Sequence, residues 1–212
     1  LHLSAHALQW QLFGERTTGY HVTNVLVHAL ACVLFAALLR RHGAGDVGSV
    51  LGGAFLLLHP ANVEAVAWIS QLKSTGALAL ALLALLAFPR GGALSAVLFG
   101  LALLMKPTAI FALPVAAWWR FGSSPGERSR AGAAGARRDA AWLVVWGALL
   151  VAFLVAELSA FHASAGHLQL RYPDLATRVR TVLALAGRYL ALSASGAGAS
   201  AFHEPEVVAV WS

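Results

Sequence analysis

The chain has 212 residues and a formal net charge of +6; 59% of it is hydrophobic and only 11% is Asp, Glu, Lys or Arg. Soluble domains carry about 25% of such charged residues, so the composition excludes a soluble domain and predicts an integral membrane protein. The basic residues gather in short clusters between apolar runs, as in loops that face anionic lipid. With no nucleic-acid-binding motif, we expect no nucleic-acid partner.

The first twenty residues are mixed in character and carry Trp10 and Tyr20, which are residue types common at membrane interfaces. Six apolar segments follow, and we predict that they form membrane spans: 22–39, 47–58, 76–88, 93–105, 107–119 and 140–156. A helix needs about 20 residues to cross a bilayer, and only the first and last segments approach that length. The other four are therefore predicted to be completed by flanking residues or to form short, broken helices.

The arginine clusters suggest an orientation. We assign 40–46, 89–92 and a basic loop at 120–139 to the cytoplasm. Residues 1–20, 59–75, Lys106 and 157–180 then lie outside. Near the end of the chain, 178–195 is predicted as an interfacial or membrane helix.

The stretch HPANVEAVAWISQLKS (59–74) interrupts two uncharged runs and is predicted as an outward-facing reversal. Pro60 suits the first turn of a helix, and the residues after it are good helix formers. We therefore expect one short helix at the membrane face, with Glu64 and Lys73 on roughly opposite sides. Solvated charges on an interfacial helix are the alternative. The predicted fold class is an all-α, polytopic helical membrane protein with short broken spans and an extracytoplasmic interfacial helix.

Lys106 is a single charge between two short apolar runs. A lone lysine at such a place faces a pathway or a partner, unless it snorkels to the interface. Pro107 and Thr108 begin the next helix, whose N-terminal dipole also favours an anion. Lys106 is therefore a candidate phosphate-binding residue.

Two further groups of polar residues stand out in the sequence. His21, Asn24 and His28 share one helical stripe without a carboxylate, which favours hydrogen bonds between helices over a metal site. No metal site is predicted, and the single cysteine, Cys32, is expected to behave as a small buried hydrophobe. Near the end of the chain stand Arg178, Arg180, Arg188, Tyr189 and FHEPE (202–206). These residues either bind a phosphate or sugar, or anchor an interfacial helix.

Four stretches resemble segments of one family, in the same order over essentially the whole chain. They are LHLSAHALQWQLFGERTTGYHVTNVLVHAL, LLHPANVEAVAWISQLKS, LLMKPTAIFALP and RTVLALAGRYLALSASGAGASAFHEPE. The second is similar to HPxHVEAVAWISERKD, which is the most specific of the four patterns. The family is the membrane glycosyltransferases of the GT-C superfamily that include the transmembrane and tetratricopeptide-repeat O-mannosyltransferases and their bacterial relatives.

The resemblance implies an enzyme that moves a sugar from a polyprenyl-phosphate carrier to a protein or glycan acceptor, with inversion at the anomeric carbon. It places Glu64 and His59 in the catalytic outer site. Lys106 and Lys73 would bind phosphate or substrate, as would Arg188 and Tyr189, which match the family's RY pair, and His203, which matches its late His. No cofactor is assigned; a divalent metal is left open. Membrane lipid is an expected partner.

The chain also departs from the family. Asn62 stands where the family has a second His, QLKS (71–74) replaces ERKD, and GAGAS (196–200) replaces a proline-bearing segment. We expect the principal acidic base to precede Leu1, any tetratricopeptide repeats to follow the end of the chain, and the segment to be a fragment that is inactive alone. The Ala, Gly and Arg bias suggests a bacterial inner membrane protein whose site faces the periplasm.

Two other classes of function stay open. A transporter or flippase-like protein fits the short broken spans, although 22–90 and 93–160 show no inverted repeat. The other alternative is a non-catalytic membrane scaffold of the same fold.

Overall fold

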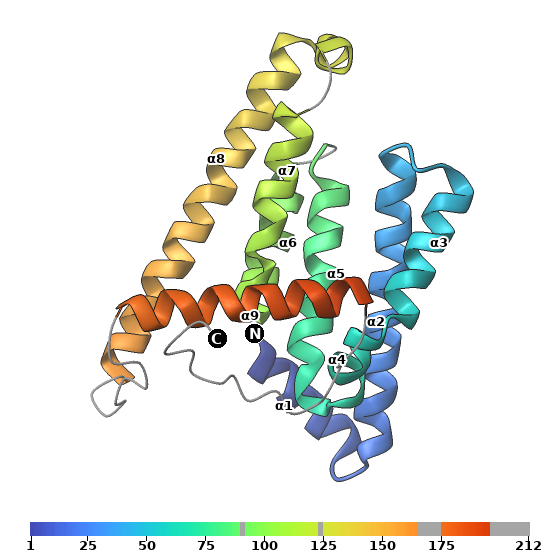
Figure 1. Cartoon of the computed structure of the whole chain (residues 1–212), viewed down its shortest axis with the longest axis vertical. Coiled ribbons are helices and arrows are strands. Elements are labelled where there is room, and N and C mark those ends of the chain that lie inside the picture. The colour runs from blue at the N-terminus through green and yellow to red at the C-terminus, as the bar shows by residue number, and fades with distance from the viewer. Residues whose placement is uncertain (90–91, 123–124, 165–174, 196–212) are drawn as a thin grey trace.

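The computed structural model describes residues 1–89, 92–122, 125–164 and 175–195 (Figure 1). In this part of the chain the regular elements are all helices, which confirms the all-α prediction. The α-helices are α1 (His2–Phe13), α2 (Thr17–Arg41), α3 (Gly45–Leu58), α4 (Val63–Ala67), α5 (Leu72–Ala87), α6 (Gly92–Met105), α7 (Ala112–Phe121), α8 (Pro125–Ser164) and α9 (Leu175–Ser195). Short 3-10 turns η1 (Pro60–Asn62), η2 (Ile69–Gln71) and η3 (Pro107–Phe111) connect some of them.

The helices α2, α3, α5, α6, α7 and α8 form a bundle (Figure 1). Helix α5 lies at its centre and packs along α2 and α6, and α8 packs against α6 and α7. In the core Trp146 of α8 stacks on Phe99 of α6, with ring centroids 4.3 Å apart and planes 4° from parallel. A Cβ added to Gly53 would lie 3.2 Å from the Cys32 carbonyl oxygen, so a small residue is what lets α3 approach α2 closely.

Three described helical stretches are long and apolar enough to cross a membrane: Thr17–Arg41, Ile69–Ala87 and Gly135–Ala160. The pair Gly45–Leu58 and Pro60–Ala67, bent by 52°, adds a fourth span if it is counted as one. Many large apolar side chains point outward on these helices, among them Val33 and Val144, where acyl chains can solvate them. The chain is therefore a polytopic helical membrane protein.

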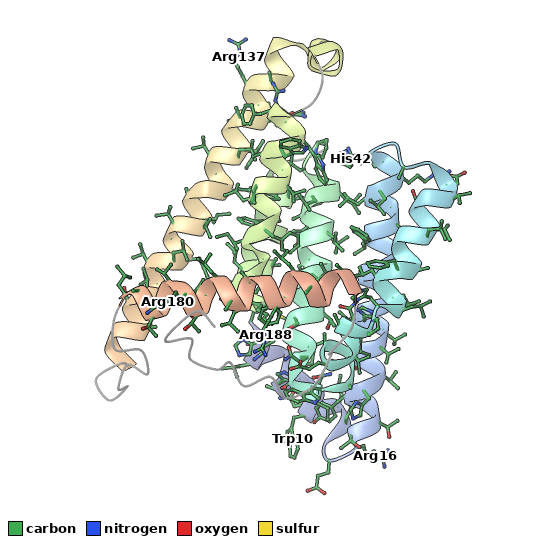
Figure 2. All side chains as sticks on the ribbon, in the orientation of Figure 1. Trp10, Arg16, His42, Arg137, Arg180 and Arg188 are labelled. Carbon is green, nitrogen blue, oxygen red and sulfur yellow. The ribbon has the colours of Figure 1, made fainter. Side chains whose placement is uncertain are left out.

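The two ends of the bundle carry different residues. Figure 2 shows His42 and Arg137 at one end, and Trp10 and Arg16 at the other. At the His42 end, Arg41 donates a hydrogen bond of 2.6 Å to the Leu86 carbonyl, and Arg138 donates one of 2.9 Å to that of Pro89. These arginines satisfy carbonyls where α5 ends, so part of this basic cluster has a structural task.

The prediction of one short helix over 59–74 is wrong. Residues 60–62 form a 3-10 turn, α4 covers only Val63–Ala67, and Trp68 is extended, with φ −87° and ψ 124°. A second 3-10 turn follows, and α5 begins at Leu72, four residues before the span predicted at 76–88. Glu64 and Lys73 therefore stand on two separate helices rather than on opposite sides of one.

The basic stretch predicted as a loop at 120–139 is mostly helical. Helix α7 continues to Phe121, and α8 starts at Pro125, with proline in its first turn. The many Ala and Arg residues after Pro125 are strong helix formers, and they outweigh the glycines that suggested turns. The run predicted as a span at 107–119 also differs, because it opens with the 3-10 turn η3 before α7 begins at Ala112.

Candidate functional site

Lys106 lies in the short connection between α6 and η3, where the backbone is extended, with φ −158° and ψ 135°. Its Nζ donates a hydrogen bond of 2.7 Å to Oγ of Ser74, in the first turn of α5. Ser74 Oγ in turn donates one of 2.5 Å to Oε1 of Gln71. This chain of polar groups holds the lysine ammonium at the start of α5, at the same end of the bundle as α4.

Burial and two neighbouring charges act on the ammonium of Lys106. Burial lowers the pKa of Lys106, the cation of Lys73 lowers it further, and the carboxylate of Glu64 raises it in part. The charges of Glu64 on α4 and Lys73 on α5 are thus near enough to act on the ammonium at the end of α6. Because the ammonium of Lys106 is half-buried and has no carboxylate within ion-pair distance among the described residues, an incoming anion would stabilise its charged form.

Asn24 of α2 contacts the interruption between α4 and α5, next to this cluster. Its side chain is 0% exposed, and its Nδ2 donates to the carbonyl of Trp68 at 2.7 Å and, more weakly, to that of Val66 at 3.5 Å. These carbonyls lie where α4 ends, and that of Trp68 also accepts a hydrogen bond of 3.0 Å from the backbone N–H of Gln71. Asn24 therefore holds the turn from which α5, with Lys73 and Ser74, begins.

His59 and Asn62 hold the bend between α3 and α4. Nδ1 of His59 accepts a hydrogen bond of 3.2 Å from the backbone N–H of Ala61, so the neutral imidazole carries its proton on Nε2. Nδ2 of Asn62 donates one of 2.6 Å to the Leu56 carbonyl near the end of α3. His59 also lines two largely apolar pockets of about 320 and 470 Å³, the smaller of which includes His28. His59 thus lies among mostly apolar side chains, whereas Lys106 lies beside polar ones.

The predicted polar stripe on α2 divides into two parts. Asn24 and His28 are buried, whereas His21 is exposed. Nε2 of His28 lies 3.7 Å from Sγ of Cys32 on the same helix. The described residues contain no group of three or more His, Cys, Asp or Glu side chains placed to hold a metal ion.

The remaining predicted residues lie away from this cluster or outside the described residues. Figure 2 shows Arg180 and Arg188 along α9, the helix that runs crosswise over the bundle, and Tyr189 follows Arg188 on the same helix. His203 lies outside the described residues. Sequence reasoning did not assign Ser74 to the site, although the signal was present: Ser74 stands where the resembling family has the acid of ERKD.

The comparisons with known proteins give one relative. Protein O-mannosyl-transferase Tmtc1 of Drosophila melanogaster is 33% identical to this chain over 108 residues. The chain is distantly related to Tmtc1. The match covers 47% of the chain but only 13% of Tmtc1, so the chain spans a small part of that protein. No protein-family model matches the chain, and no solved structure does.

Proposed function

We propose that this chain is part of a membrane glycosyltransferase that takes a sugar from a polyprenyl-phosphate carrier and transfers it to a protein or glycan acceptor. The observation that carries this proposal is the half-buried Lys106, held by Ser74 beside Lys73 and Glu64. The distant relationship to a protein named as an O-mannosyl-transferase supports the reaction class. By the orientation of the arginine clusters, the site faces the periplasm of a bacterial inner membrane.

In this reaction the bond between the anomeric carbon and the carrier phosphate oxygen breaks, and an acceptor oxygen forms a new bond to that carbon. Lys106 and Lys73 stabilise the negative charge that develops on the departing phosphate. The acceptor hydroxyl gives its proton to the principal acidic base expected from the family resemblance, and Glu64, on α4, accepts a hydrogen bond from that hydroxyl and orients it. His59 donates a hydrogen bond to substrate through Nε2–H, because its Nδ1 is occupied by the Ala61 N–H.

Lys106→Met tests the phosphate role, since it keeps the length of the side chain and removes the charge. In the whole protein, with polyprenyl-phosphate-linked mannose as donor, kcat should fall by roughly 100- to 1000-fold, as when one donor to a developing negative charge is removed. Arg16→Gln is the matched control, because Arg16 is an exposed cation at the same end of the molecule. Transfer at the wild-type rate by Lys106→Met would show that Lys106 is not part of the phosphate site.

Glu64→Gln tests the role of this carboxylate, with Glu15→Gln as the control on an exposed acid in the turn after α1. We expect the transfer rate to fall by roughly 100-fold for the first variant, as when a group that positions a reactant is lost, and not to change for the second. Lipid or solute uptake into vesicles without any sugar transfer would instead support a transporter. The absence of transfer and uptake in the wild-type protein would support a scaffold.

A further inference from the structure

Helix α9 is amphipathic, and its apolar side faces away from the protein. Successive residues of a helix are about 100° apart, so one side of α9 gathers its large apolar residues. These residues are all exposed: Leu175, Val179, Val182, Leu183, Tyr189 and Leu190. Val182 is 63% and Leu190 is 72% exposed. A helix packed on a water-soluble protein would turn this side inward.

The opposite side of α9 is polar and faces the bundle. Thr177 and Thr181 are only 3% and 2% exposed. Arg180 donates to Oγ1 of Thr177 at 3.5 Å, and its buried Nε has no hydrogen-bond partner among the described residues. The side that the protein covers is therefore the polar one, which is the reverse of an ordinary surface helix.

The polar side does not rest on the bundle along its full length. Arg188 lies on the same stripe as Thr177 and Thr181, yet it is exposed whereas both threonines are buried. Farther along, Ala194 lines a pocket with His59 and Pro60, at the bend between α3 and α4. Helix α9 thus reaches from the end of α8 toward this bend, as Figure 1 shows, and its polar side is covered near Thr177 and Thr181 but not at Arg188.

We propose that α9 is embedded in the bilayer as a wall, with acyl chains on its apolar outer side and a hydrated chamber beneath its polar inner side. The acyl chains are the partner that the outer side fits, because its apolar surface matches the lipid-facing surface of the spanning helices, such as that at Val144. Three arginines, Arg178, Arg180 and Arg188, stand on α9. Arg180 and Arg188 lie on the inner side, where water can solvate them. This inference does not depend on glycosyl transfer.

Single cysteines carrying nitroxide labels test the outer side, in a background in which the native cysteines, Cys32 among them, are replaced by Ala. The whole protein is labelled at Val182→Cys or Leu190→Cys and reconstituted in phosphatidylcholine vesicles. Collisions with lipid-soluble oxygen and with a water-soluble nickel chelate are then compared. The oxygen-to-nickel ratio at both positions should equal that of Val144→Cys, which is 72% exposed on a spanning helix.

The inner side is tested in the same way with Ala184→Cys and Arg188→Cys, which should give a several-fold lower ratio through access of the nickel chelate. Ala184→Cys keeps Arg188 in place, so it tests the prediction even if the loss of Arg188 disturbs folding. Nickel access at Val182 and Leu190 would place the outer side in water and overturn the proposal. Exclusion of both reagents there would mean that a second protein copy covers it, and exclusion of both at Ala184 would mean that no chamber exists.

Discussion

Asn24→Ala should destabilise the protein, because Asn24 joins two segments that are far apart in the sequence. The variant removes the donor to the Trp68 carbonyl, a hydrogen bond of 2.7 Å that joins residues 44 positions apart. The Trp68 carbonyl keeps the backbone N–H of Gln71 as a partner at 3.0 Å, so the variant loses one hydrogen bond, which is worth roughly 0.5–1.5 kcal/mol. His21→Ala, on the same helix and in the same predicted stripe, removes an exposed side chain and should change stability by less than about 0.5 kcal/mol.

The free energy of unfolding can be measured in mixed micelles by raising the mole fraction of SDS and following tryptophan fluorescence. Asn24→Asp sharpens the test, because only its protonated form has a donor for the Trp68 carbonyl. The ionised carboxylate has no donor for that carbonyl, so Asn24→Asp should be less stable at neutral pH than at low pH, where the carboxyl is protonated. Equal stability of Asn24→Ala and His21→Ala would refute the assignment of Asn24 as the residue that holds the break at Trp68.

Three further predictions concern other parts of the molecule. Trp146→Ala should cost roughly 3–5 kcal/mol in the same unfolding assay, because the ring is fully buried, whereas Trp118→Ala, at an exposed residue, should cost little. Asn62→Ala should cost about 1 kcal/mol through the lost hydrogen bond near the end of α3, and unchanged unfolding would contradict this. Burial and Lys73 lower the pKa of Lys106, so its ammonium loses its proton at a lower pH than that of an ordinary lysine. The KM for a phosphate-linked donor should therefore rise from that lower pH. Lys106→Arg should remove that pH dependence, because a guanidinium stays charged, and identical KM profiles would contradict the role of the lysine.

The candidate site was partly predictable. Lys106 stands out in the sequence because a single charge among apolar residues is costly and therefore conspicuous. Its partner Ser74 does not stand out, because a serine near the start of an apolar run is chemically ordinary. The convergence of Glu64 and Lys73 on Lys106 was not predictable either, since it follows from the break between α4 and α5.

Composition and local chemistry alone determined that this is an all-helical membrane protein, and they located several helix ends. Helix α6 covers Gly92–Met105, close to the predicted 93–105, because the Lys-Pro pair that ends it is adjacent in sequence. Only the tertiary structure decided the break at Trp68 and the direction in which α9 faces. Both depend on groups distant in the chain, a buried asparagine on α2 for the first and the bundle beneath the helix for the second. Helix propensity and hydrophobic periodicity describe neighbours along the chain, so neither contains that information.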